Sequence, residues 1–164
     1  EIDVHEFAMV LMKDTGFKSM VIKEYLPVIN QLINMYLKKL GSYFYFEFDE
    51  NFDDTVLARH VDELQYASLS GGERIRLTLA ILFTWRYICI KKNTANCNLL
   101  ILDEIFSESL DRDGVDATIA LLKELNGIHT FIISPNSENI RPKFSDIIEV
   151  TKPADFSVYT SITQ

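Results

Sequence analysis

An apolar run that ends in two carboxylates constrains the fold of this chain more than any other feature. The run Leu99–Leu102 is followed directly by Asp103 and Glu104. Such a run is typical of a strand buried in a parallel sheet. Ligands of open α/β sheets bind at the carboxyl ends of these strands. We therefore expect Asp103 to face Mg²⁺ and Glu104 to face an attacking water.

About thirty residues earlier lies a helix start that suits phosphate. Ser70 and Glu73 have the spacing of a capping box, which predicts that the helix begins at the pair Gly71 and Gly72. The first amides of a helix lack intrahelical partners, and the helix dipole favours an anion there. Either element alone also fits an ordinary turn or a capped helix. Together, and followed by Ser109-Leu110-Asp111, they predict half of an ATP site.

In this order and spacing the motifs resemble those of the ABC-type ATPases. Leu69–Glu73 resembles their signature motif, Leu99–Glu104 their Walker B strand and Ser109–Asp111 their D-loop. Segments 16–30 and 33–37 resemble the helical lead-in of SMC-like DNA repair ATPases of the SbcC type, which include the ATPase subunits of T-even phage recombination nucleases. The resemblance implies an α/β fold: the C-terminal lobe of an ABC-type P-loop NTPase head, with parallel strands, flanking helices and the base of a coiled coil.

The resemblance also implies a mechanism in which two heads dimerise around ATP and control a nuclease that acts in DNA double-strand break repair. The signature residues, Ser70 among them, would act in trans on the ATP of the second head. Asp103 would hold Mg²⁺, Glu104 would position or deprotonate water, and Asp111 would organise the dimer face. The implied partners are a second copy of the head, an N-terminal ATPase lobe with the phosphate loop, an SbcD-type calcineurin-like nuclease subunit, and DNA through the assembled complex.

No phosphate loop of the form G-x-x-x-x-G-K-[ST] occurs among the six glycines of the sequence. The nearest imitation is the segment 16–19, in which Phe17 separates Gly16 from Lys18. The chain also lacks an initiator methionine. We therefore expect a C-terminal piece of a longer polypeptide, whose phosphate loop lies upstream beyond a coiled coil. On its own this piece is expected to be an inactive ATPase.

The formal charge of −8 argues against nucleic-acid binding by this chain alone, because Lys and Arg make most of the contacts to nucleic-acid phosphates. Two short basic pairs, 38–39 and 91–92, are explained by the preference of helix ends for cations, with local DNA contact as the alternative. The sequence has neither an apolar run long enough to span a membrane nor a secretion signal. These observations predict a cytoplasmic protein, in the host cell if it is encoded by a phage.

One position departs from the ABC-type pattern. Many of these ATPases carry a histidine after the strand that follows Walker B, where this chain has Pro135. Proline offers no donor for that contact. Ser134 and Asn136 are the alternative donors at this switch position, and ordinary turn chemistry also explains them.

Hydrophobic periodicity and turn residues divide the chain into alternating elements. A helical lead-in over 1–42 and a C-terminal lobe over 43–164 are predicted. A break at Thr15–Gly16 should separate two lead-in helices, and Pro27 should lie in the first turn of the second, which ends at Gly41. Gly127 should cap another helix. Helices are predicted over 4–13, 75–92 and 113–125, and strands over 43–48, 56–59, 99–102, 130–134, 147–150 and 156–162.

Three other functions fit parts of the pattern. An SMC-type chromosome-organising head is nearest, because the motifs do not separate it from a repair ATPase. An ABC transporter subunit shares the motifs, but its signature usually ends in Gln where this chain has Glu73. The third is an assembly lobe with no activity of its own. Upstream heptads and a phosphate loop would favour the repair and SMC functions.

Overall fold

The computed structural model describes residues 17–58, 61–64, 66–92, 97–106, 109–125, 127–135, 140–153 and 155–163. The predicted helix over 4–13, the predicted break at Thr15–Gly16 and the candidate site residue Asn136 lie outside these ranges. The predicted division into a lead-in and a lobe stays a prediction.

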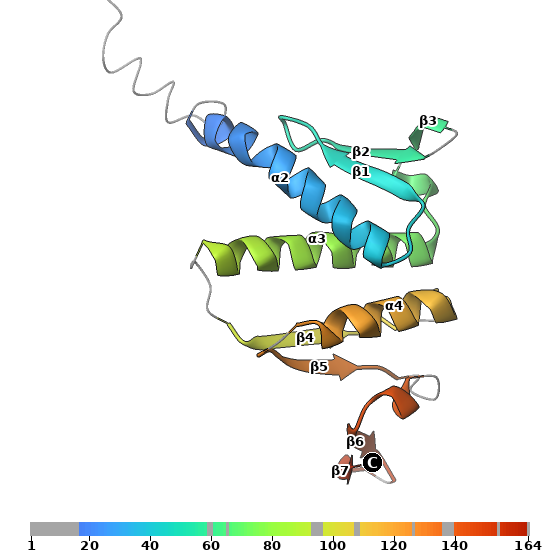
Figure 1. The fold of residues 1–164 in the computed structure, drawn as a ribbon. Helices are drawn as coiled ribbons and strands as arrows, with labels where there is room; N and C mark the ends of the chain where they lie inside the picture. The colour runs from blue at the N-terminus through green and yellow to red at the C-terminus, as the bar shows by residue number, and fades with distance from the viewer. Residues whose placement is uncertain are drawn as a thin grey trace, which may run out of the picture.

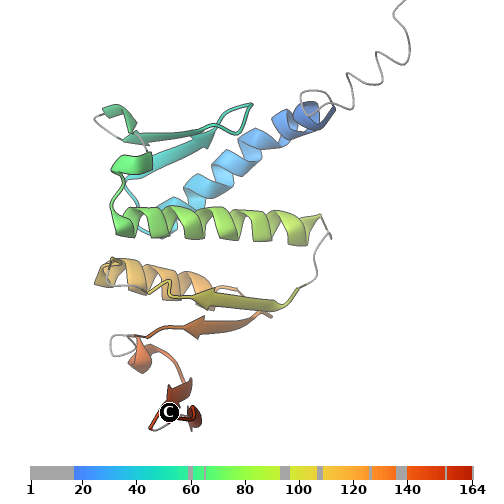
Figure 2. The same ribbon diagram turned by 180° about the vertical axis from the view of Figure 1, so that it is seen from behind.

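The central element of the fold is helix α3 (Gly71–Lys91). On one side of it lie helix α2 (Phe17–Lys39) and a small antiparallel sheet; on the other lie helix α4 (Arg112–Lys123) and a parallel strand pair (Figure 1, and from behind in Figure 2). The buried side chains of these layers form one continuous core cluster. The α/β fold expected from the sequence is confirmed.

Helix α2 packs on α3 and places an apolar stripe in the core. Ile29, Ile33 and Leu37 are almost fully buried along this stripe, and so is Leu40 directly after the helix. The prediction that Pro27 lies in the first turn is wrong, because the helix already begins at Phe17 and Pro27 lies inside it. Proline in a helix interior removes one backbone hydrogen bond. The buried neighbours Leu26 and Ile29 offset that loss by packing in the core.

The antiparallel sheet has the strand order β1-β2-β3. The strands are β1 (Phe44–Phe48), β2 (Asp54–Ala58) and β3 (Val61–Leu64). Alternation along β1 buries Phe44 and Phe46, as the period of a strand requires. The first two strands are close to their predicted positions, whereas β3 was not predicted. The short 3₁₀ helix η1 (Tyr66–Ser68) then leads into α3.

Helix α3 begins where the sequence predicts but is not buried all round. Leu77, Leu79 and Phe83 are buried in the core, whereas Trp85 and Tyr87 are exposed. The segment 75–92 is apolar on nearly every side, which predicts a helix enclosed by its neighbours, and that prediction is wrong. Within the described residues, α2 and the β4 layer cover two sides of α3 and leave its last turns partly open.

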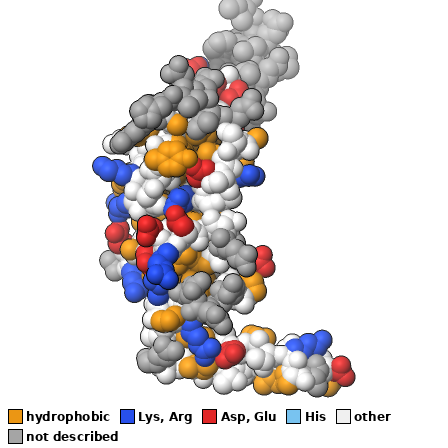
Figure 3. All heavy atoms as spheres, turned by 90° about the vertical axis from the view of Figure 1, so that its right-hand side faces the viewer, with side chains coloured by type: hydrophobic (Ala, Val, Ile, Leu, Met, Phe, Trp, Pro, Cys, Tyr) orange, Lys and Arg blue, Asp and Glu red, His pale blue; other side chains and the backbone are white. Residues whose placement is uncertain are grey.

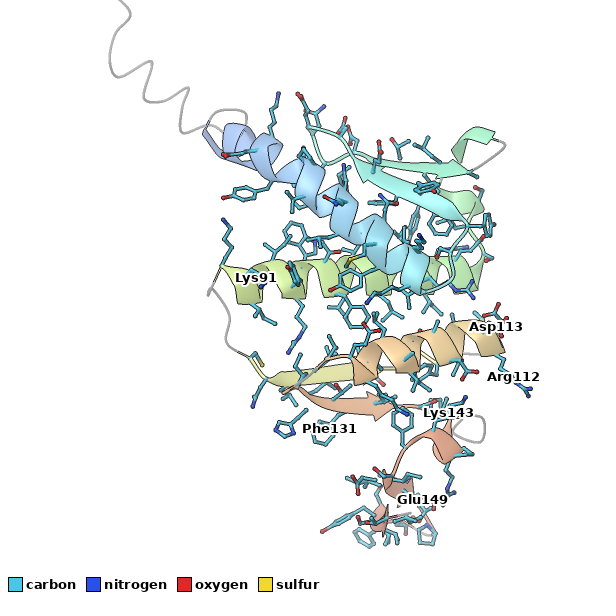
Figure 4. The ribbon with its side chains drawn as sticks, in the orientation of Figure 1. Lys91, Arg112, Asp113, Phe131, Lys143 and Glu149 are labelled. Atoms are coloured by element: carbon cyan, nitrogen blue, oxygen red, sulfur yellow. The ribbon has the colours of Figure 1, made fainter. Side chains whose placement is uncertain are left out.

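Strands β4 (Leu99–Asp103) and β5 (His129–Ile133) form a parallel pair, joined through α4. This confirms the predicted parallel arrangement. The expectation that β4 is fully buried is wrong, because Leu100 and Leu102 are buried while Leu99 and Ile101 are exposed. Figure 4 shows Phe131 of β5 on the sheet face that points away from α4. Helices of the described chain cover only the opposite face.

The chain ends in an antiparallel hairpin that follows the 3₁₀ turn η2 (Arg141–Lys143). The hairpin strands are β6 (Asp146–Thr151) and β7 (Val158–Thr163), near their predicted positions. It lies at the end of the molecule farthest from α2 (Figures 1 and 2). None of the described helices is both long and apolar enough to cross a membrane.

Candidate functional site

The sequence motifs meet at one end of the molecule. Helices α3 and α4 both begin at this end, and β4 and β5 both run towards it (Figure 1). Figure 4 places Arg112 and Asp113, the first residues of α4, at this end, whereas Lys91 marks the opposite end of α3. In Figure 3, which faces this end, acidic and basic side chains lie close together among hydrophobic groups. Two helix starts and two strand ends therefore share one surface.

Ser70 is the N-cap of α3, as the sequence predicts. Its hydroxyl oxygen accepts a hydrogen bond from the Glu73 amide at 3.4 Å, and the Glu73 carboxylate accepts one from the Ser70 amide at 2.6 Å. The predicted capping box is therefore confirmed. Leu69 is buried and anchors the helix start, whereas Ser70 and Gly71 are exposed. The exposed start of α3 can receive an anion from outside.

Glu73 is 9% exposed as a residue, and both of its carboxylate oxygens accept hydrogen bonds. Its second oxygen accepts a hydrogen bond from the hydroxyl of Tyr43. Burial raises the pKa of the Glu73 carboxyl, but the hydrogen bonds from Ser70 and Tyr43, with the nearby charge of Arg76, outweigh burial and lower the pKa overall. The same contact with Glu73 raises the pKa of the Tyr43 hydroxyl.

The two signature glycines pack against the D-loop. A Cβ atom on Gly72 would lie 2.5 Å from the carbonyl oxygen of Ser109, and one on Gly71 would lie 2.9 Å from the Ser109 hydroxyl oxygen. Both distances are shorter than ordinary contacts, but only at Gly72 is the neighbouring atom backbone, so there only glycine lets the two backbones approach this closely. The structure therefore brings together the predicted signature and D-loop residues.

Asp111 is the N-cap of α4 and the point at which the D-loop is tied to α3. Its carboxylate accepts hydrogen bonds from the Gly114 amide at 2.8 Å and from the Arg76 guanidinium at 2.5 Å. These two contacts lower the pKa of the Asp111 carboxyl. The neighbouring Leu110 is buried and holds the loop to the core.

Asp103 and Glu104 lie at the carboxyl end of β4, where both are exposed. The amide of Glu104 donates to the carbonyl oxygen of Ile133 at 2.9 Å, which extends the sheet ladder by one residue. Glu104 has a φ of +54°, in the left-handed region that non-glycine residues rarely adopt. Strained backbone of this kind costs about 1–2 kcal/mol and gathers at functional sites.

The switch position lies beside this strand end. Ser134 directly follows Ile133, whose carbonyl oxygen accepts the hydrogen bond from Glu104. Pro135 is exposed, and Asn136 lies outside the described residues. The structure thus places Ser134 next to the end of the Walker B segment.

Asp103 has the chemistry of a Mg²⁺ ligand, because Mg²⁺ prefers carboxylate oxygens and is bound by one or two of them together with phosphates and waters. In the described part of the chain, no group of three or more His, Cys, Asp or Glu side chains could form a metal cage. A single exposed carboxylate at a strand end fits a metal that is shared with a nucleotide.

Two contributors to this end of the molecule were not singled out from the sequence. Arg76 contacts Asp111, and it follows Glu73 by three residues on the same helix face, a spacing that could have indicated it. Tyr43 contacts Glu73 from thirty residues away in the sequence, and no local pattern indicates that contact.

The chain is similar in sequence to curated phage proteins. It is 35% identical over 150 residues to "Exonuclease subunit 2" of Escherichia phage RB69, covering 92% of this chain and 26% of that protein. It is 34% identical over 148 residues to "Exonuclease subunit 2" of Enterobacteria phage T4, covering 90% of this chain and 26% of that protein. The chain thus spans about a quarter of the length of these relatives. No protein-family model matches it.

Solved structures with a similar fold include an Smc head domain with an extended coiled coil derived from Pyrococcus furiosus. The TM-score is 0.66 at 19% identity, and the match covers 89% of this chain and 37% of that chain. At this identity the similarity establishes the fold. The sequence similarity to the phage exonuclease subunits and the fold similarity to the Smc head are consistent with each other.

Proposed function

This chain is the C-terminal lobe of an SbcC-like ABC/SMC ATPase, and from that premise we propose that it completes an ATP site and that two such ATPase heads dimerise around ATP and control a partner nuclease. The observation that carries the proposal is the contact of the signature glycines with Ser109 beside the carboxyl end of β4. A phosphate-binding helix start and a carboxylate pair lie at the same end of the molecule.

Within one head, Asp103 and Glu104 serve the nucleotide that this head binds. Asp103 holds Mg²⁺, which when bound neutralises charge on the phosphate oxygens. Glu104 follows the strand end in a left-handed backbone conformation, and its carboxylate orients the attacking water and accepts its proton. Ser134 or Asn136 hydrogen-bonds the phosphate or the water in place of the usual histidine.

Across the dimer, the signature end of α3 serves the nucleotide of the second head. Ser70 and the amides at Gly71 and Gly72 cover the γ-phosphate, because a helix start offers unpaired donors and a positive dipole end. Asp111 and Arg76 hold the D-loop beside this surface. ATP therefore lies between the heads and joins them.

The β-phosphate must be held by a phosphate loop that this sequence does not contain. We assign that loop to an N-terminal lobe of the same polypeptide, since this chain matches only 26% of the length of each phage relative. The chain on its own therefore does not hydrolyse ATP. Magnesium-dependent turnover by the purified chain, free of contaminating ATPase, would contradict this assignment.

The partner in this proposal is a nuclease subunit of the SbcD type, with DNA bound by the assembled complex. The phage relatives are named as exonuclease subunits, which supports a nuclease partner. The net charge of −8 favours DNA contact through the complex over contact through this lobe alone. A chromosome-organising SMC head is the second candidate, favoured by the fold neighbours. A copurifying nuclease that ATP stimulates would favour the nuclease-complex ATPase over the chromosome-organising SMC head.

Substitution Ser70→Arg in the complete protein tests the proposal. It places a large cation where the γ-phosphate must approach the backbone, and it leaves that head's own Walker B residues unchanged. Each head should still bind ATP, while ATP-induced dimerisation and hydrolysis fall together. Ser157→Arg, on an exposed residue just before β7, adds the same charge far from the site and is the matched control.

Thermal stability measured on the same preparations separates this effect from loosening of the fold, because loss of an N-cap costs about 1 kcal/mol. A Ser70→Arg protein that is stable, binds ATP and dimerises normally would show that Leu69–Glu73 is an ordinary helix start.

A further inference from the structure

We propose that Tyr43 is a positioning residue for the signature end of α3: its hydroxyl holds the Glu73 carboxylate and ties the start of α3 to the end of α2. The inference rests on the proposed trans role of the signature motif. It adds a residue that lies outside the motif and belongs to neither α3 nor the sheet of Asp103. Tyr43 lies directly before β1, in the short connection that leaves α2.

The backbone on both sides of Tyr43 is firmly held. Before it, Gly41 takes a φ of +76° and the Ser42 amide donates to the carbonyl oxygen of Leu37 at 3.0 Å, which closes the C-terminal turn of α2. After it, Phe44 is 3% exposed in the core. Tyr43 therefore has little freedom to move independently of α2 and β1.

Helix α2 is fixed to the edge of β1 by two side-chain amides. Asn34 donates to the Phe46 carbonyl oxygen at 2.7 Å and accepts from the Phe46 amide at 2.9 Å. One turn earlier, Asn30 makes the same pair of hydrogen bonds with Phe48, at 2.9 and 3.0 Å. Each asparagine thus replaces a neighbouring strand at the edge of the sheet. A shift of α2 would carry β1, and with it Tyr43.

At the other end of the link, both carboxylate oxygens of Glu73 are occupied. One accepts from the Ser70 amide and the other from the Tyr43 hydroxyl. The Ser70 amide belongs to the N-cap, so the orientation of Glu73 sets where Ser70 and the following glycine amides point. Tyr43 thereby acts on the phosphate-facing atoms through Glu73 and touches none of them itself.

The tyrosine ring contributes little to the core. Tyr43 is 61% exposed, and its ring meets Phe44 edge-on with centroids 6.0 Å apart. Its hydroxyl, in contrast, bonds to a nearly buried carboxylate. Substitution Tyr43→Phe keeps the ring and removes only that contact, so it separates positioning from folding.

The experiment compares Tyr43→Phe with the unchanged complete protein, with Tyr45→Phe as the matched control. Tyr45 is an exposed tyrosine of β1, and its substitution removes one hydroxyl two residues away. Thermal stability, ATP binding and ATP-dependent head association are measured together, with kcat and KM for hydrolysis. We expect Tyr43→Phe to lower thermal stability only slightly, to keep the protein folded at the assay temperature with ATP binding unchanged, and to weaken association and kcat about ten-fold, as loss of a hydrogen bond to a charged group implies. Tyr45→Phe should resemble the unchanged protein.

The Glu73→Gln background tests whether the effect passes through Glu73. An amide presents one acceptor oxygen in place of two, so it cannot accept from Ser70 and Tyr43 in the same way. Adding Tyr43→Phe to Glu73→Gln should therefore weaken association much less than adding it to the unchanged protein. A full ten-fold effect in both backgrounds would overturn the proposal, and so would a loss of association that is fully accounted for by loss of folded protein.

Failure of this inference is distinguishable from failure of the proposed function. If Ser70→Arg abolishes association while Tyr43→Phe behaves like Tyr45→Phe, the signature acts in trans and Tyr43 does not position it. If Ser70→Arg also leaves association unchanged, the trans role fails and the inference fails with it.

Discussion

The guanidinium of Arg76 donates a hydrogen bond of 2.5 Å to the carboxylate of Asp111, across 35 residues of sequence. This contact joins the second turn of α3 to the N-cap of α4, directly beside the close approach of Gly72 to Ser109. The Arg76 side chain is 12% exposed and that of Asp111 64% exposed, so the ion pair itself contributes little stability. The effect of the ion pair is geometric, because it fixes the position at which the D-loop ends and α4 begins.

The close approach of Gly72 predicts a specific mutational cost. Gly72→Ala places a Cβ atom 2.5 Å from a backbone oxygen of Ser109, so the signature and the D-loop must separate. We expect a loss of about 1–3 kcal/mol in the free energy of unfolding, measured by urea denaturation of the chain. Gly71→Ala is the comparison and should cost less, since its Cβ would meet only the Ser109 side chain, the hydroxyl oxygen at 2.9 Å and the Cβ at 3.0 Å. Equal losses in the two variants would contradict this packing.

The lowered pKa values of Glu73 and Asp111 predict how stability depends on pH. Both carboxyls bind protons less readily in the folded chain than in the unfolded chain. Their stabilisation is therefore complete above the ordinary values of 4.5 and 3.8, and it is lost as the pH falls through the lower folded values.

Urea midpoints between about pH 5 and pH 3 measure this loss. The variants Glu73→Gln and Asp111→Asn should lose less stability over that interval than the unchanged chain. Asp113→Asn, at an exposed carboxylate in the first turn of α4, is the control. If the two variants follow the same pH curve as the unchanged chain, these contacts do not stabilise the fold.

The proposed role of Glu104 predicts that its substitution separates ATP binding from ATP hydrolysis. In the complete protein, Glu104→Gln should lower ATP hydrolysis by about 10²-fold or more, because the amide keeps the shape of the side chain and cannot accept a proton. ATP binding and ATP-induced dimerisation should persist. Single-turnover hydrolysis measured beside nucleotide binding checks both expectations. Unchanged turnover would remove Glu104 from its role.

The left-handed backbone of Glu104 predicts that glycine is a more stable substitute than alanine at this position, the reverse of the usual order. Glycine takes a φ of +54° without strain, whereas alanine retains the strain. The chain with Glu104→Gly should therefore be more stable than the chain with Glu104→Ala, by about 0.5–1 kcal/mol in urea unfolding. At the neighbouring Asp103, which lies in regular strand conformation, alanine should be the better substitute. If alanine is the more stable substitute at both positions, the backbone of Glu104 is unstrained.

Local chemistry explains which features could be predicted. The capping box needs only residues three apart, so Ser70 and Glu73 specify the start of α3 before any tertiary contact forms. The apolar run after Asn98 similarly specifies a strand, and its carboxylates necessarily come at its end. Gly127 has a φ of +74°, but the C-cap of α4 is Glu124, so the prediction that Gly127 caps this helix is wrong.

Pro27 and the exposed face of β4 show where local rules failed. Local preference assigns proline to a first turn, but burial of Leu26 and Ile29 against neighbouring elements holds the helix through it. An apolar strand is expected to be covered on both faces, yet Ile101 is exposed because no described helix lies on its side of the sheet. Both outcomes depend on which elements are neighbours.

The sequence by itself determined the elements and the residue types of the site, because caps, turns and apolar runs act over a few neighbouring residues. The tertiary structure decided which of these residues meet. Tyr43 reaches Glu73, Arg76 reaches Asp111, and Gly72 approaches Ser109, each across thirty or more residues. Such contacts form only when core packing closes the loops between them, and no short pattern in the sequence records that closure.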